Sequence, residues 1–227
     1  MQNNVSVAVI LSGSGYLDGA EIREAVLSLL SLDQQAARVS IFAPNIDQHH
    51  VINHITSEET NETRNVLVES ARIARGDIKP LSELDASAFD ALVLPGGFGV
   101  AKNLSDLAFK GADSQAIDAF SHIVKAFHAA GKPIGAICIA PAVIASILGE
   151  HNPTLTIGED KGTASAIETM GGTHQNCATD ETVYDEKNNI VSCSAYMRDD
   201  NISNVAIGID KLVKKVVALA ASGSIAA

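Results

Sequence analysis

A single cysteine, Cys138, follows the apolar run Lys132–Ile137 and precedes a segment of small residues that contains Pro141. This order is typical of a strand, a sharp turn and a helix, because proline is tolerated in the first turn of a helix. A cysteine on such a turn lies above the sheet, and the helix N-terminus favours its thiolate. The pattern therefore predicts an exposed nucleophilic thiol of low pKa. The alternative is a small core residue, as free cysteines often are.

Two adjacent glycines, Gly96 and Gly97, end another apolar run within Phe89–Gly99. Adjacent glycines let the backbone turn sharply and aim an N–H group outward. The Gly97 amide is the best placed to donate to an oxyanion. With the amide of Ile139, it forms the predicted oxyanion site. The alternative is a turn without a chemical role.

Acidic residues follow the first apolar run, Val5–Leu11. Glu21 is the preferred carboxyl group to approach the thiol and move protons, and Glu24, one helical turn further on, is its rival. The spacing of Asp18 and Glu21 also fits a capping box, in which both residues only stabilise the start of a helix. Both interpretations stay open at this point.

Short apolar runs alternate with longer amphipathic segments, which is typical of parallel strands joined by helices. The predicted strands are Val5–Leu11, Arg38–Pro44, Phe89–Gly99, Lys132–Ile137, Thr154–Gly158, and strands within Thr173–Met197 that turn at Asn188 and Asn189. The predicted helices are 18–32, Asn61–Gly76, Ala112–Gly131, the segment after Cys138, and a last helix with Asp199 or Asp200 as its N-cap. The carboxyl ends of the strands form the ligand-binding edge of such sheets. We therefore expect one α/β domain over residues 1–227, with its site at that edge.

In the first predicted helix, Ile22, Val26, Leu29 and Leu30 share one face, as the spacing of an amphipathic helix requires.

The formal net charge of -11 makes nucleic acid and anionic membranes poor partners. No run approaches the ~18–20 apolar residues that span a bilayer. The three cysteines, Cys138, Cys177 and Cys193, are sparse and odd in number, which argues against a disulfide framework. These properties favour a cytoplasmic protein.

The acidic residue after the first strand, "PGGFG", and a cysteine between strand and helix, in that order, resemble the PfpI superfamily with its class I glutamine amidotransferase-like fold. The segments "ILSGSGYLDGAEIREAV", "ETRNVL", "ESARIARG", "PGGFGVAKNLS", "GKPIGAICIAPA" and "GIDKLV" resemble the ElbB group of enhancing lycopene biosynthesis proteins. The resemblance extends over nearly the whole chain. It implies a flavodoxin-like three-layer sandwich, a mostly parallel central sheet and a nucleophile elbow at Cys138.

The same resemblance implies a glyoxalase-type activity that converts glyoxal, a small carbonyl substrate, to glycolate without a cofactor or metal. It also implies a homodimer and a link to isoprenoid metabolism. The stretches that resemble the group contain Asp18, Glu21, Arg64, Asn65, Lys102 and Asn103, which become candidate pocket residues. Arg64 and Asn65 also fit a solvated helix face, and Lys102 also fits a surface cation.

The chain departs from the superfamily at one position. Many members pair the cysteine with a histidine, in some directly after it, but Ile139 occupies that place here. A partly desolvated carboxyl group, Glu21 by preference, can handle the proton instead. Two other functions stay open: a redox sensor with a reactive cysteine, and a non-catalytic partner protein.

Overall fold

Seven strands form one sheet in this computed structural model, which describes residues 5–223. Their order is β10-β11-β7-β6-β1-β2-β5. Their bounds are Ser6–Ile10 (β1), Arg38–Ala43 (β2), Lys79–Pro80 (β5), Ala91–Leu94 (β6), Ile134–Ile137 (β7), Val183–Asp185 (β10) and Ile190–Cys193 (β11). Only β10 pairs antiparallel within this sheet. The central strands β6 and β7 are buried along their whole length, as expected for a parallel sheet covered on both faces.

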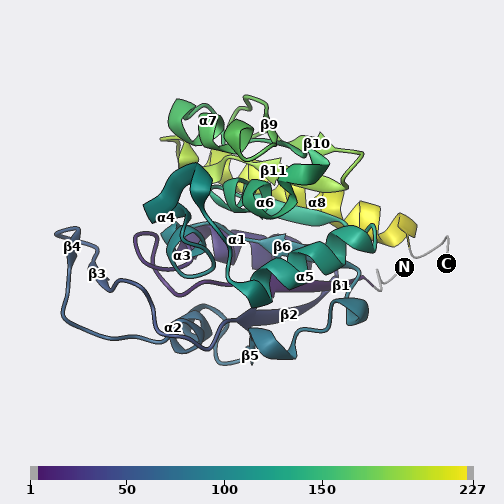
Figure 1. The fold of residues 1–227 in the computed structure, drawn as a ribbon. Coiled ribbons are helices and arrows are strands. Elements are labelled where there is room, and N and C mark those ends of the chain that lie inside the picture. Colours follow the sequence, from purple (N-terminus) through teal and green to yellow (C-terminus); the bar gives the residue numbers. More distant parts are fainter. Residues whose placement is uncertain (1–4, 224–227) are drawn as a thin grey trace.

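Helices cover both faces of the sheet, which confirms the predicted α/β sandwich (Figure 1). Two apolar clusters fill the space between the sheet and its two helical layers. The helices are α1 (Ile22–Gln34), α2 (Val66–Ile73), α3 (Phe98–Lys102), α4 (Leu107–Lys110), α5 (Asp118–Ala129), α6 (Ala140–Leu148), α7 (Lys161–Thr169) and α8 (Ile202–Gly223). None of the helices in the described part of the chain is long and apolar enough to cross a membrane. The extension of the single domain over the termini, residues 1–4 and 224–227, lies outside the described residues.

Two small two-stranded sheets lie outside the main sheet. Strands β8 (Thr154–Leu155) and β9 (Thr173–His174) pair in parallel, and β3 (Ile52–Asn53) pairs antiparallel with β4 (Glu58–Glu59). The β3–β4 hairpin projects from the body of the molecule (Figure 1). The sequence pattern did not predict this hairpin.

The predicted turn between the last two strands is confirmed at Asn189, which has a φ of 55°. The last helix begins at Ile202, so its N-cap lies one or two residues later than the predicted Asp200 or Asp199. Its first turn is capped by Asn201, whose side-chain oxygen accepts a hydrogen bond from the Asn204 amide at 3.0 Å. Asp200 instead accepts hydrogen bonds from Asn201 and Asn204 side chains.

Helix α1 packs beside α8, and its buried side consists largely of small and polar residues, with Glu24, Ala25, Ser28, Ser31 and Leu32 on it. The apolar side chains of Ile22, Val26 and Leu30 lie at the surface instead. Of the four residues that the periodicity identified, Leu29 alone packs against the core of this chain, and the prediction is wrong for the other three.

Candidate active site

Cys138 lies on a tight turn between β7 and α6, one residue past the end of the strand. Its φ is 63°, a left-handed conformation that costs a non-glycine residue about 1–2 kcal/mol. The backbone N–H of Cys138 donates to the Cys193 carbonyl at 2.9 Å, which ties the turn to β11. A strained residue held at a strand end is the geometry of a nucleophile elbow.

The Cys138 side chain is buried, with only 7% of the residue exposed. Burial raises the pKa of the Cys138 thiol well above its usual value, and the neighbouring Glu24 carboxylate raises it further. The prediction of an exposed, low-pKa thiol is therefore wrong. The helix N-terminus does not compensate for the loss of water around the sulfur.

Glu24 is the carboxyl group that contacts the thiol. It lies in the first turn of α1, is fully buried, and hydrogen-bonds the Cys138 side chain. Its Oε2 accepts from the Gly96 amide at 3.0 Å, and its Oε1 accepts from the Tyr196 amide at 3.1 Å. Burial raises the pKa of Glu24 to about 8, and the charge of Glu21 contributes to the shift. Glu24 is therefore mostly protonated at neutral pH.

Glu21, the preferred candidate, has a different place. Its side chain is the N-cap of α1 and accepts a hydrogen bond from the Glu24 amide at 2.6 Å. The capping interpretation is right for Glu21, although the cap is not the predicted box. Asp18 is buried elsewhere, where its Oδ2 accepts from the Ile52 amide at 2.7 Å. Glu21 influences the site through its negative charge, which raises the pKa of Glu24.

Gly96 and Gly97 form the turn after β6, opposite the cysteine. The backbone N–H groups of Gly97 and Ile139 both hydrogen-bond the Cys138 sulfur and lower the pKa of the thiol, which opposes the effect of burial. Gly97 has a φ of 97°, and a Cβ there would lie 2.3 Å from the Glu21 nitrogen. A Cβ on Gly96 would lie 2.3 Å from the Cys138 Cβ. The close approach of these turns therefore requires both glycines.

Three further candidate residues, Asp18, Lys102 and Asn103, form hydrogen bonds that stabilise the loop after β1. The Asn103 amide group donates to the Ser12 and Asp18 carbonyls, both at 2.9 Å. Lys102 Nζ donates to the Leu17 carbonyl at 2.8 Å. Asp18 is 3.8 Å from His54 through its other carboxylate oxygen. These residues hold the loop that leads into Glu21 and Glu24.

Arg64 and Asn65 belong to the start of α2. The Asn65 side chain caps this helix by accepting from the Val68 amide at 3.1 Å. Arg64 pairs with Glu62 at 2.7 Å and with Glu69 at 3.7 Å. Both residues are thus engaged in stabilising a helix end, which supports the interpretation as a solvated helix face.

The sequence pattern missed the contribution of the chain that follows β11. Ala195 has a φ of 41°, and this turn aims the Tyr196 amide at Glu24. Cys193 is fully buried, and burial raises the pKa of its thiol well above the usual value, with a further contribution from the charge of Glu24. One signal was available: Cys193 ends a strand, so it lies at the same sheet edge as Cys138.

No cluster of three or more histidine, cysteine or acidic side chains able to hold a metal ion occurs among residues 5–223. The site instead joins one thiol, one carboxyl group with a raised pKa and two backbone amides. Such a group can form a covalent adduct with an electrophile and move a proton beside it.

Comparison with known proteins places this geometry in a family. The profile of the DJ-1/PfpI family matches residues 77–195, the segment that contains Gly96, Gly97 and Cys138. A human protein named glutamine amidotransferase-like class 1 domain-containing protein 3, mitochondrial, is 42% identical over 223 residues, which cover 94% of this chain and 82% of that protein. The location of that relative is mitochondrial by name, and the cytoplasmic location expected for this chain stays a prediction.

Solved structures agree with this assignment. An isoprenoid biosynthesis protein with an amidotransferase-like domain from Ehrlichia chaffeensis is 45% identical, with a TM-score of 0.89 and coverage of 95% of this chain and 99% of that one. Glyoxalase III from Candida albicans shares the fold, with a TM-score of 0.62 at 16% identity and coverage of 95% and 97%. From its sequence and its fold, the chain belongs to the DJ-1/PfpI family.

Proposed function

We propose that this protein is a cofactor-independent glyoxalase-type enzyme that converts glyoxal to glycolate, with Cys138 as the nucleophile and Glu24 as the group that moves protons. The observation that carries the proposal is the hydrogen bond between the buried Glu24 carboxyl group and the strained Cys138 thiol. The name of the Candida protein, glyoxalase III, adds that the fold can hold such an activity. The name of the Ehrlichia relative refers to isoprenoid biosynthesis, for which the site residues give no physical argument.

The reaction begins with addition of the thiol to one aldehyde carbon of glyoxal. The ionised carboxylate of Glu24 takes the thiol proton while the sulfur–carbon bond forms, and Glu24 then passes this proton to the aldehyde oxygen to give a hemithioacetal. The amides of Gly97 and Ile139, which face the sulfur, stabilise the negative charge that develops beside it. Glu24 is close enough to take part because it contacts the reacting sulfur directly.

The hemithioacetal then rearranges without any external oxidant. Glu24, again a carboxylate, removes the proton from the carbon bonded to sulfur and passes it to the oxygen of the second aldehyde, and an enediol forms. The hydroxyl group on the sulfur-bearing carbon then loses its proton and the second carbon gains one. This gives a thioester, so that one carbon is oxidised while the other is reduced. Water hydrolyses the thioester to glycolate and restores the thiol. A carboxyl group with a pKa of about 8 suits these transfers, because it can both accept and donate a proton near neutral pH.

A redox-sensing function is less well supported. Sensor cysteines are accessible and have a low pKa, because oxidation follows the thiolate. Cys138 is buried, and its pKa is raised well above the usual value. These properties favour a thiol that becomes nucleophilic only when its proton is taken by Glu24.

The test is glyoxal consumption and glycolate formation by the purified protein and by Cys138→Ser. We expect the substitution to abolish turnover, because a hydroxyl in this setting is a much weaker nucleophile than a thiol. Cys177→Ser is the matched control, since Cys177 is half-buried outside the contacts of Glu24, and it should keep wild-type turnover. Turnover retained by Cys138→Ser would overturn the proposal.

A further inference from the structure

Backbone amides from two different turns hold the carboxyl group of Glu24. Its Oε2 accepts a hydrogen bond from the Gly96 amide at 3.0 Å, and its Oε1 accepts one from the Tyr196 amide at 3.1 Å. Gly96 is fixed by its close approach to Cys138. Tyr196 lies in the short 3₁₀ turn Ala195–Met197 after β11, and the place of this turn decides whether the amide reaches the carboxyl group.

The turn is only partly stabilised by its own residues. The Met197 amide donates to the Ser194 carbonyl at 2.9 Å. Ala195 has a φ of 41°, which is unfavourable for alanine and persists only where surrounding contacts enforce it. The Ser194 hydroxyl could cap the turn, but it is buried and hydrogen-bonds none of the described residues. A contact from outside the turn must therefore help to hold it.

The side chain of Tyr196 makes such a contact with α1. Its hydroxyl accepts a hydrogen bond from Arg23 Nη1 at 3.3 Å, and the Arg23 guanidinium lies 5.8 Å from the centre of its ring. A cation over an aromatic ring is attracted to it. Arg23 directly precedes Glu24 in the first turn of α1, so the helix meets the turn at two neighbouring points.

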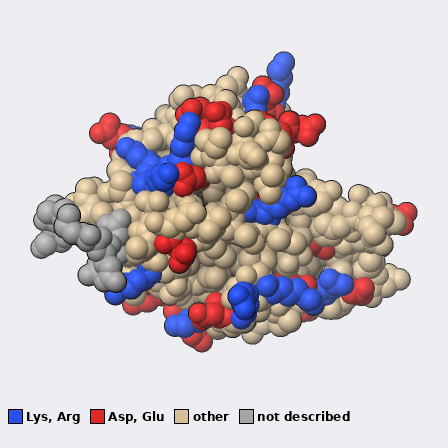
Figure 2. Space-filling view, turned by 180° about the vertical axis from the view of Figure 1, so that it is seen from behind, with Lys and Arg blue, Asp and Glu red and all other residues tan. Residues whose placement is uncertain are grey.

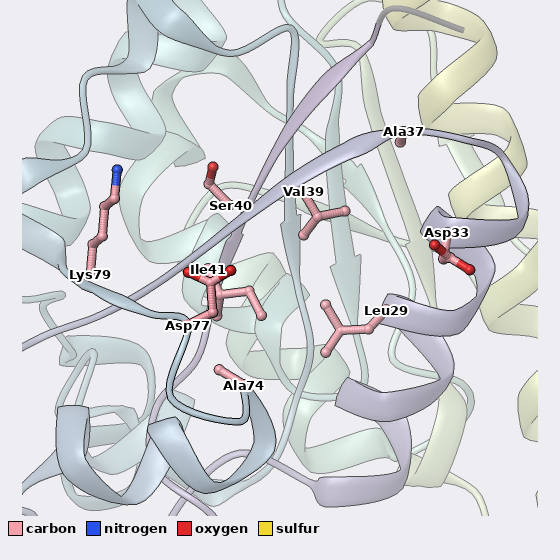
Figure 3. A pocket seen from close by; sticks show the side chains of 9 residues that line it. All are labelled: Leu29, Asp33, Ala37, Val39, Ser40, Ile41, Ala74, Asp77 and Lys79. Atoms are coloured by element: carbon pink, nitrogen blue, oxygen red, sulfur yellow. The ribbon is translucent and has the colours of Figure 1, made fainter. Parts of the chain in front are cut away.

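The first turn of α1 depends on such contacts because the helix is open on one side. A hollow of about 440 Å³ lies between its second half, β2 and the end of α2, and Figure 3 shows Leu29 pointing into it. On another side α1 packs beside α8. The position of its first turn is therefore set by α8 and by the turns that converge on the site.

The guanidinium of Arg23 is available to the tyrosine. Arg23 forms no salt bridge with any residue in the described part of the chain, and Glu21 attracts it without such a contact. Figure 2 shows the face that α1 and α8 cover, where charged side chains are sparse over a broad area. Few carboxylates therefore compete with Tyr196 for this cation.

We propose that Tyr196 is a positioning residue for Glu24, and that its side chain acts by binding Arg23. The contact between Arg23 and Tyr196 keeps the turn after β11 at the distance from α1 at which the Tyr196 amide donates to the carboxyl group. This role rests on the proposed function, because Glu24 is the base of that reaction. It adds a side chain outside α1 on which the base depends.

Loss of this tether has a consequence of known sign. The hydrogen bond from the Tyr196 amide favours the ionised form of Glu24 and lowers the pKa of this carboxyl group against the effect of burial. Without it, the pKa should rise above about 8, and less carboxylate should be present at neutral pH to accept the thiol proton. The titratable groups that face this carboxyl group are Cys138, Cys193 and Glu21, and all three stay in place when the tether is lost.

Alkylation of Cys138 tests the tether without glyoxal. The rate of carbamidomethylation by iodoacetamide, followed between pH 6 and 9 by mass spectrometry of the Cys138 peptide, measures how readily the thiol gives its proton to Glu24. We expect Tyr196→Ala to react about tenfold more slowly than the wild-type chain at pH 7, and the difference to shrink toward pH 9. Tyr196→Phe keeps the ring and should show a smaller shift in the same direction.

Tyr184→Ala is the matched control. Tyr184 is also half-buried, its hydroxyl hydrogen-bonds Asn189 at 3.4 Å, and Lys215 lies 4.3 Å from the centre of its ring. It lies on the edge strand β10. Loss of stability should appear in both alanine variants, whereas only Tyr196→Ala should move the pH profile of alkylation. Equal shifts in the two variants, or no shift in Tyr196→Ala, would overturn the proposal.

A double-mutant cycle tests the partner. Arg23→Lys keeps the positive charge near Glu21 but loses the planar group that spans the hydroxyl and the ring. It should shift the profile in the same direction as Tyr196→Ala, and the two substitutions together should do little more than Tyr196→Ala alone. Shifts that add in full would contradict the role of Arg23. A wild-type chain without glyoxal turnover would contradict the proposed function alone, because alkylation reports on Cys138 and Glu24 whatever the substrate.

Discussion

At the scale of single residues, the site depends on one proton shared by Cys138 and Glu24. Burial raises the pKa of both groups, so both are largely protonated at neutral pH. Coupled groups of this kind titrate as a pair, and the pair is reactive when it holds one proton, since one member must act as base and the other must supply a proton. The first proton to leave is associated with the carboxyl group, because its pKa is the lower of the two.

This predicts that kcat/KM for glyoxal rises with pH up to about 8 and then levels. Below pH 8, Glu24 is protonated and cannot accept the thiol proton, so the rate should fall about tenfold for each pH unit. Initial rates of glyoxal loss between pH 6 and 9 measure this profile. A wild-type profile that is flat over this range would exclude Glu24 as the base.

Two substitutions separate the roles of the acidic residues in that profile. Glu24→Gln removes the base and should lower the rate about 100-fold or more and flatten the profile. Glu21→Gln removes a charge that raises the pKa of Glu24, so it should move the rising limb to lower pH and leave the thiol chemistry intact. The reverse pattern would assign the proton transfer to Glu21.

At the scale of elements, four chain turns converge on the site. They follow β1, β6, β7 and β11, and each contributes either a side chain or a backbone amide to Cys138 and Glu24. The turns approach so closely that Gly96 has no room for a side chain. Its added Cβ would lie 2.3 Å from the Cys138 Cβ and 2.7 Å from Glu24 Oε2.

Gly96→Ala should therefore separate the thiol from the carboxyl group. We expect kcat/KM for glyoxal to fall about 100-fold, because small displacements of reacting groups are that costly. The added methyl group should also lower the free energy of unfolding by about 1–3 kcal/mol, measured by denaturant titration. Gly162→Ala in α7 is the control, since the nearest atom to its Cβ is 3.6 Å away. Unchanged activity in Gly96→Ala would mean that the two turns are not closely packed.

The elements also show what could be predicted from the sequence. The elbow at Cys138 and the glycine turn were predictable because strand, turn and helix signals are local. The carboxyl group was harder, since the exact start of α1 decides whether Glu21 or Glu24 lies in the first turn. Helix α1 begins at Ile22, which makes Glu21 the cap. The contribution of Tyr196 had no local signal, because an alanine, Ala195, adopts the positive φ that directs it.

The two sides of α1 illustrate a further limit. An apolar stripe on a helix predicts burial, but it does not say against what. Here α1 packs beside α8, the small residues Ala25 and Ser28 lie on its buried side, and Ile22, Val26 and Leu30 remain exposed. A pattern within one chain therefore predicted the helix correctly and left its packing partner undetermined.

At the scale of the whole molecule, charge and apolar surface would act in opposition in the homodimer that the sequence predicts. Each chain carries a formal net charge of -11, so association brings two acidic bodies together. The exposed apolar side chains on the surface, such as Ile22, Val26 and Leu30 of α1, carry no charge that could offset this repulsion. Long-range repulsion should therefore dominate the electrostatic part of the dimerisation free energy.

Salt should consequently tighten the homodimer that the sequence predicts. The screening length falls from about 30 Å at 0.01 M to about 10 Å at 0.1 M ionic strength, so repulsion between the two bodies is largely removed over this range. We expect the dissociation constant, measured by sedimentation equilibrium, to decrease severalfold. The dissociation constant of the double variant Arg23→Asp with Asp33→Arg should depend on salt as that of the wild-type chain does, because the two proteins have the same net charge. A dimer that loosens with salt would mean that ion pairs rather than apolar contacts hold the copies together.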